Sequence, residues 1–141
     1  MRTTIAVAVC LAFIAIALWH VHMARATTIG VSGAVPTVDG KPLFTPSRKA
    51  TLAVAVVLLL FAALVASTAG LIATGLPPVL LRWLSYALAA GLLARAIGDF
   101  RYLGLFKRVR GSRFATLDSW VYSPICVLLA IGVALVATAA S

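Results

Sequence analysis

The sequence predicts an all-α fold: a polytopic membrane protein whose single domain, residues 1–141, is a four-helix transmembrane bundle. Three observations lead to this prediction. The chain is 63% hydrophobic and only 11% charged, with a mean hydropathy of +1.12, far outside the range of soluble domains. Glu, Asn and Gln do not occur in it, although the surface of a soluble domain of this size needs such residues. The apolar residues also form runs long enough to cross a bilayer.

The first helix is predicted over about residues 5–24, an uncharged run that ends at Arg25. A signal peptide is the alternative interpretation, with Arg2 before the apolar run and Ala-Arg-Ala at 24–26 as a small-residue cleavage site. Against cleavage, the charged region before the run is a single residue. Three polar or aromatic side chains also precede the supposed cut: Trp19, His20 and His22. We therefore expect an uncleaved helix.

The second and third helices are predicted from one uncharged stretch, residues 50–81, which is too long for a single helix. The sequence Thr-Gly-Leu-Pro-Pro at 74–78 divides it, because Gly follows helix ends and Pro opens helices. We expect the second helix over about 50–73 and the third over about 78–98. The preceding loop, 25–49, is rich in Gly and Pro and too short to be a domain.

The fourth helix is predicted over about 120–140, after a basic connector at 99–118. Trp120 suits the membrane interface at its start, and Asp118 or Ser119 is the expected N-cap. In the connector, apolar residues alternate with cations, a pattern typical of a segment that lies on the membrane surface. These surface cations are Lys107, Arg108, Arg110 and Arg113.

Lys and Arg are distributed unevenly between the two sides of the predicted bundle. Nine lie in the two loops that share one side, whereas Arg2 and Arg82 lie on the other. Cytoplasmic loops of membrane proteins carry an excess of positive charge. We therefore expect the loops 25–49 and 99–118 in the cytoplasm and both termini outside.

The net charge of +9 favours anionic partners. In a soluble protein such a charge suggests nucleic acid, but here the cations cluster between apolar runs, which indicates anionic lipid head groups instead. The expected partners are the lipid bilayer and its anionic head groups. A membrane-protein partner or a homo-oligomer stays open, and no nucleic acid is expected.

Sequence motifs for catalysis or metal binding do not occur. There is no nucleophile elbow, Cys-x-x-Cys, His-Glu-x-x-His or glycine-rich phosphate loop, and three carboxylates provide poorly for a metal. His20 and His22 are two residues apart and point to nearly opposite sides of a helix. We expect no metal, no cofactor and no catalytic residue, and a non-enzyme rather than an enzyme.

The candidate site lies where the third helix meets the basic connector. Arg95 precedes Asp99 by four residues, the weaker order for a helical ion pair, and an aspartate in the last turn opposes the helix dipole. We therefore expect Asp99 to pair with another element or to face a polar cavity, either as a structural ion pair or as a ligand or proton site. The candidate ligand-binding residues, all expected in one leaflet, are Arg95, Asp99, Arg101, Tyr102 and His20.

Five strings of residues are the most distinctive parts of the sequence: Ala34-Val-Pro36-Thr37, Gly40-Lys-Pro42-Leu-Phe44-x-Pro46, Arg95-Ala-Ile-Gly-Asp99-Phe-Arg101-Tyr102, Phe106-Lys107 and Tyr122-Ser-Pro124. Together they resemble a family of small bacterial membrane proteins with four spans, catalogued only as a domain of unknown function. The Ala-Ile-Gly-Asp-Phe-Arg-Tyr string is the most specific. The resemblance covers nearly the whole chain and implies a bacterial cytoplasmic (inner) membrane location. It implies no activity, substrate or cofactor.

The expected function is that of an integral inner-membrane protein that binds a lipid or a membrane partner through a polar cluster on the cytoplasmic side. Two alternatives stay open. One is a small membrane enzyme or carrier that acts on a sterol-, quinone- or isoprenoid-like substrate, with His20 or Asp99 handling protons. The other is an accessory subunit of a membrane complex.

Overall fold

The computed structural model describes residues 1–25 and 34–139. Within these residues, four helical segments are long and apolar enough to cross a membrane. The fourth runs without a break from Arg113 to Thr138 but contains a π-helical turn. In chain order the helical elements are α1 (Arg2–Arg25), α2 (Arg48–Thr68), α3 (Pro78–Ile97), α4 (Arg113–Leu117), the π-helical turn η1 (Asp118–Tyr122) and α5 (Ser123–Thr138). The predicted all-α four-helix fold is confirmed.

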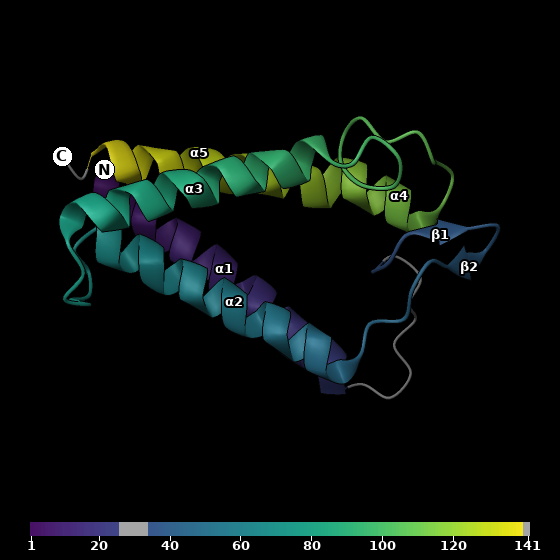
Figure 1. Ribbon diagram of the computed structural model, residues 1–141, viewed down its shortest axis with the longest axis horizontal. Coiled ribbons are helices and arrows are strands. Elements are labelled where there is room, and N and C mark those ends of the chain that lie inside the picture. Colours follow the sequence, from purple (N-terminus) through teal and green to yellow (C-terminus); the bar gives the residue numbers. More distant parts are fainter. Residues whose placement is uncertain (26–33, 140–141) are drawn as a thin grey trace.

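The helices form two antiparallel pairs, in which α1 packs along α2 and α3 packs along α5 (Figure 1). The pairs meet near the chain termini and the α2–α3 connection, and they diverge toward the opposite end. We call the end where the two pairs meet the terminal end. The opposite end, which carries residues 34–47 and 98–112, is the loop end. A small antiparallel hairpin of β1 (Thr37–Val38) and β2 (Lys41–Pro42) lies there.

The hydrophobic core lies where the two pairs meet. Phe13 of α1, Val65 of α2 and Val133 of α5 are completely buried in it. The rings of Phe13 and Phe61 pack edge to face with their centroids 5.8 Å apart, which joins α1 to α2. Gly132 permits the close crossing of α1 and α5, because a Cβ at this position would lie 2.6 Å from a methyl group of Val9.

Large apolar side chains are exposed along every spanning helix. Leu11, Leu60, Trp83 and Leu128, one from each segment, are 60–68% exposed. Apolar surface of this extent is not tolerated by a monomer in water. Because it surrounds helices of spanning length, it is the surface that contacts lipid acyl chains.

Helix α2 ends at Thr68, before the expected end near residue 73, because Gly70 adopts the left-handed conformation (φ +77°). The N–H of Leu71 donates to the carbonyl of Ala66 at 2.8 Å, and the N–H of Gly70 donates to Ser67 at 3.0 Å. This pair of bonds is a Schellman motif, which satisfies the last carbonyls and stops the helix.

The fourth helical segment begins at Arg113, earlier than the expected start near residue 120. The hydroxyl of Ser112 accepts a hydrogen bond from the N–H of Ala115 at 3.0 Å and so caps α4. The π-helical turn η1 follows at once. Pro124 has no N–H, and its ring crowds the carbonyl of Trp120 four residues earlier. This crowding explains why the turn before Pro124 is widened.

Arg2 joins two helix ends at the terminal end. Its Nη1 donates to the carbonyl of Ala139 at 2.6 Å and its Nη2 to the carbonyl of Ala69 at 2.7 Å. These carbonyls belong to the C-terminal ends of α5 and α2, where the helix dipole favours a cation. We call this contact the Arg2 clamp.

Candidate functional site at the loop end

Asp118 of η1 is the centre of a polar cluster at the loop end, and its side chain is completely buried. Oδ1 accepts a hydrogen bond from Nη2 of Arg95 at 2.7 Å. Oδ2 accepts from Nζ of Lys107 at 3.1 Å and from the backbone N–H of Gly104 at 2.6 Å. One carboxylate thus holds α3, the following loop and the fourth helix together. We call Arg95, Lys107 and Asp118 the buried charge cluster.

Lys107 lies inside this cluster and is only 2% exposed, whereas the sequence placed it on the membrane surface. Besides Asp118, its Nζ reaches the carbonyl of Gly104 at 2.9 Å and the hydroxyl of Ser119 at 2.7 Å. These contacts use all three ammonium hydrogens. A lysine can be buried in this way only when its charge is paired and its donors are satisfied. The alternation of apolar residues and cations in the connector does not reveal which of the cations has such partners.

Arg95 stands in the last turn of α3 and pairs with Asp118 rather than with Asp99. Its Nη1 is buried and has no hydrogen-bond partner among the described residues, and the same is true of the hydroxyl of Ser123. Because one carboxylate faces two cations, the cluster keeps one positive charge that no described carboxylate neutralises. Its chemistry suits a further acceptor, either a water or an anionic oxygen.

Asp99 organises the loop after its own helix. Its Oδ1 accepts the backbone N–H groups of Arg101, Tyr102 and Leu103 at 2.7–2.9 Å. These donors, that of Leu103 foremost, hold the pKa of Asp99 below its usual range. The expectation that Asp99 pairs with another element is therefore wrong for the described residues. The structural ion pair between elements exists, but Asp118 makes it.

Two glycines close the loop that Asp99 caps. Gly98 and Gly104 both have positive φ (+87° and +86°), and a Cβ on either would overlap the backbone of the other side of the loop. The N–H of Leu105 also donates to the carbonyl of Ala96 at 2.8 Å. Residues 98–104 therefore form a closed turn whose last N–H, that of Gly104, points at Asp118.

The other predicted site residues are more scattered. The guanidinium of the exposed Arg101 lies over the ring of Tyr102, 5.0 Å from its centroid. His20 lies on the other helix pair, and its Nδ1 is 2.8 Å from the carbonyl of Ile16 in its own helix. α1 diverges from α3 toward the loop end (Figure 1), and the hydrogen bonds of His20 and Arg95 share no partner among the described residues. The remaining predicted surface cations are all exposed: Arg108, Arg110 and Arg113.

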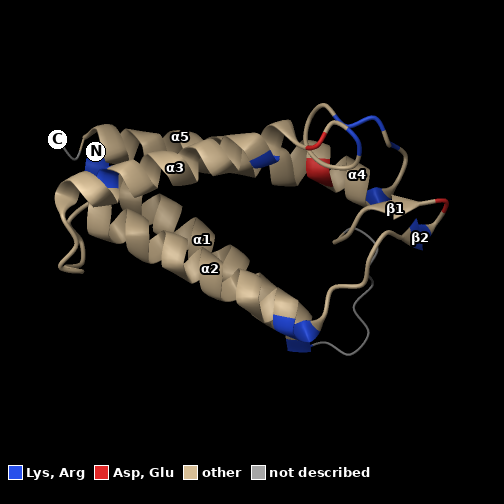
Figure 2. Cartoon of the chain, in the orientation of Figure 1, with Lys and Arg blue, Asp and Glu red and all other residues tan. Residues whose placement is uncertain are grey.

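The arrangement favours anions over metals as ligands. Among residues 1–25 and 34–139, no group of three His, Cys, Asp or Glu side chains could hold a metal ion. Lys and Arg are instead concentrated at the loop end (Figure 2).

Asp118 is the functional candidate that sequence reasoning underrated, since the sequence suggested a possible N-cap on the same side of the bundle as Arg95 but no ion pair between them. Two signals pointed to it. It is the one acidic residue in the fourth helical segment. It lies near the N-terminal end of that segment, and Arg95 lies near the C-terminal end of the antiparallel α3, so the two are at the same end of the bundle. A charge near the end of an apolar helix needs a partner at the same depth.

Four spanning helices with a buried polar cluster at one end define the class of this chain: it is a multi-pass α-helical membrane protein. The family described as protein of unknown function (DUF3995) matches residues 3–133. The chain belongs to this family, which confirms the resemblance found in the sequence. No curated protein and no solved structure matches the chain.

Proposed function

We propose that this chain is a non-enzymatic protein of the bacterial cytoplasmic membrane whose loop end binds anionic lipid head groups. In this proposal the loop end faces the cytoplasm and both termini lie outside. Ten of the twelve Lys and Arg residues belong to the loop end, and only Arg2 and Arg82 belong to the terminal end. This asymmetry supports the orientation, because short cytoplasmic loops retain positive charge.

The observation that carries the proposal is that the described carboxylates near the cations are already engaged. Asp118 is shared by Arg95 and Lys107, and Asp99 accepts three N–H groups of its own loop. No ion pair in the described part of the chain neutralises the exposed arginines of residues 101–113. Their counter-charges must come from outside, and anionic lipids supply them at this depth, at about 1 kcal/mol per Lys or Arg.

An enzyme or carrier acting on a hydrophobic substrate gains no support from the candidate proton-handling residues. His20 belongs to the α1–α2 pair and contacts a carbonyl of its own helix. Asp99 follows α3 of the other pair, and its exposed carboxylate already accepts three N–H groups. The two do not form a common site. Lipid binding therefore remains the function that the geometry supports best.

The test is the lipid composition around the protein after extraction into polymer-bounded membrane discs. We expect phosphatidylglycerol to be enriched over phosphatidylcholine relative to the bulk membrane, and added salt to reduce the enrichment. The double variant Arg101→Gln/Arg108→Gln, which loses about 2 kcal/mol of this attraction, should reduce it by up to about thirtyfold. The matched control Arg82→Gln, at the terminal end, should leave it unchanged. If the ratio of the two lipids around the wild-type protein equals their ratio in the bulk membrane, the proposal is overturned.

A further inference from the structure

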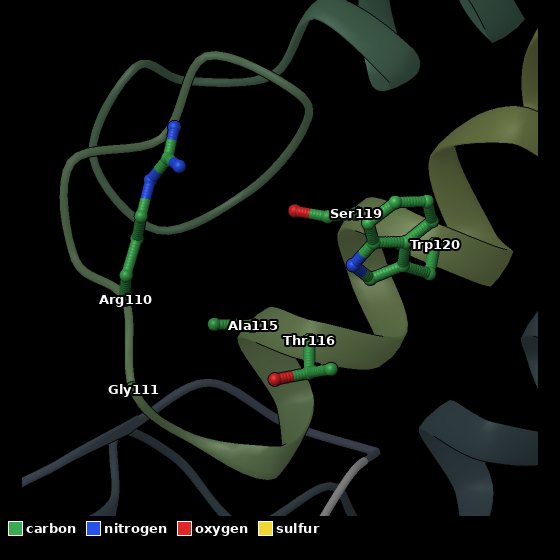
Figure 3. A pocket seen from close by; sticks show the side chains of 6 residues that line it. All are labelled: Arg110, Gly111, Ala115, Thr116, Ser119 and Trp120. Atoms are coloured by element: carbon green, nitrogen blue, oxygen red, sulfur yellow. The ribbon is translucent and has the colours of Figure 1, made fainter.

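A hollow of about 160 Å³ opens on the outer face of α4 and η1 at the loop end (Figure 3). Arg110 and Gly111 line it from the loop that precedes α4, and the other lining residues belong to α4 and η1. The lining residues are Arg110, Gly111, Ala115, Thr116, Ser119 and Trp120. Since a water occupies about 30 Å³ of liquid, the hollow has room for a group of several heavy atoms.

Three of the four polar side chains that line this hollow can donate to a ligand, namely those of Arg110, Ser119 and Trp120; the hydroxyl of Thr116 donates to the carbonyl of Ser112 at 3.3 Å. In Figure 3 the hydroxyl of Ser119 and the indole nitrogen of Trp120 point toward the space beside Arg110. The oxygen of Ser119 already accepts from Lys107 at 2.7 Å, and an ammonium only donates, so the serine O–H is left to donate. The indole N–H and the guanidinium also only donate. No carboxylate lines the hollow. Its ligand must therefore be rich in acceptors.

The charge around the hollow selects an anion. Lys107 lies directly behind Ser119 and belongs to the buried charge cluster, which keeps one uncompensated positive charge. Arg110, which lines the hollow, adds a second positive charge. Guanidinium and hydroxyl donors converging on a small space suit a phosphate, which accepts several charge-assisted hydrogen bonds.

The hollow also lies at the end of an apolar stripe. On α5 the exposed side chains of Ile125, Leu128, Ile131 and Leu135 recur at three- or four-residue steps and so share one face. The wider π-helical turn brings Trp120, five residues before Ile125, onto the same face. An acyl chain that follows this stripe toward the loop end would bring its head group to the hollow.

We propose that the hollow binds the phosphate of an anionic glycerophospholipid whose acyl chains lie along this stripe of α5. This inference rests on the proposed function and gives head-group binding a defined place. Arg110, Ser119 and Trp120 donate to the phosphate oxygens, and Lys107 supports them from behind.

The test is native mass spectrometry of the full-length protein released from nanodiscs of phosphatidylcholine that contain phosphatidylglycerol. We expect one phosphatidylglycerol to stay bound to each chain. Its retention should fall about tenfold in Arg110→Gln, which loses charge-assisted bonds, and about threefold in Trp120→Phe, which loses only the N–H. Arg108→Gln, which removes a loop-end arginine outside the hollow, should reduce it less than Arg110→Gln does. The matched control Trp83→Phe should change it by less than about twofold.

The outcomes separate this site from the proposed function. If Arg110→Gln and Arg108→Gln reduce retention equally, or if Trp120→Phe behaves as Trp83→Phe does, the hollow is not the site, although head-group binding by the loop end still stands. If the wild-type protein does not prefer phosphatidylglycerol over phosphatidylcholine at all, both proposals fail. Inorganic phosphate that displaces the bound lipid at low concentration would overturn the assignment to a lipid, because the acyl chains would then contribute nothing.

Discussion

The carboxylate of Asp118 shows how a single residue can fix the position of three segments. Burying an ion is costly, and a buried pair stabilises a fold only if its remaining lone pairs and hydrogens are satisfied. Here Arg95 and Lys107 supply the charges, and the Gly104 N–H fills a further acceptor position. The main role of the cluster is therefore to fix how the loop packs on η1. The intact cluster adds little to the free energy of unfolding, but removing the carboxylate should lower that free energy strongly, because two cations then lack their anion.

Asp118→Asn should lower the free energy of unfolding by about 3 kcal/mol, because it leaves two cations at a buried site without their anion. Unfolding titrations in mixed detergent micelles measure the change. Asp39→Asn is the matched control, since Asp39 is exposed in the β-hairpin turn, and it should cost no more than about 0.5 kcal/mol. Equal stabilities of the two variants would contradict the structural role of the cluster.

At the scale of the element, the turn over residues 98–104 shows where sequence reasoning stops. Local rules predicted that Asp99, in the last turn of the third helix, does little for that helix, whereas in the structure α3 ends at Ile97 and Asp99 lies beyond it. The inference that its partner was distant failed, because the partners are three N–H groups within the next four residues. They converge only because Gly98 and Phe100 both have positive φ, and φ at Phe100 is not visible in the sequence.

The Asp99 turn should be sensitive to acid. The folded-state pKa of Asp99 lies below its unfolded value of about 3.9, so its stabilising effect is complete above that value and is lost as the pH falls through the folded pKa. Asp99→Ala should therefore destabilise the protein at neutral pH by on the order of 0.5–1 kcal/mol, as the loss of a helix cap does. The difference from wild type should shrink below about pH 4.

Thermal unfolding of both proteins between neutral and acidic pH measures this difference. Asp99→Asn is the control, since it keeps an acceptor oxygen but does not titrate in this range. Its stability relative to Asp99→Ala should stay constant with pH. A cost of Asp99→Ala that did not change with pH would show that the charge of the carboxylate is irrelevant to the turn.

At the scale of the whole molecule, the number of helices and their membrane-spanning character were predictable, since both follow from apolar runs divided by Gly and Pro. The pairing of helices was not. Small residues are so frequent that Gly132, which permits the close crossing of α1 and α5, resembles many other positions. Arg2 was likewise predicted only as a flanking charge. Its two carbonyl partners, Ala69 and Ala139, lie 67 and 137 positions later in the sequence.

Arg2→Ala should lower the free energy of unfolding by about 2 kcal/mol, because the charge-assisted hydrogen bonds from Arg2 to the ends of α2 and α5 are lost at a partly exposed site. Arg2→Lys should fall between this variant and wild type, since a lysine cannot reproduce the fork of the guanidinium. Unfolding in mixed micelles measures both, and Arg82→Ala, also at the terminal end, is the matched control. An Arg2→Ala protein as stable as this control would show that the clamp adds nothing.

The Arg2 clamp also sets an order of events during biosynthesis. The α1–α2 pair has its own interface, including the contact between Phe13 and Phe61, so it can assemble while the later helices are still being translated. Arg2 cannot complete its contacts at that stage, because Ala139 is synthesised 137 residues later. Nη2 can already reach the carbonyl of Ala69 in the α1–α2 pair, but Nη1 must remain hydrated or bound to head groups until α5 has entered the membrane. Only the insertion of α5 can then complete the Arg2 clamp.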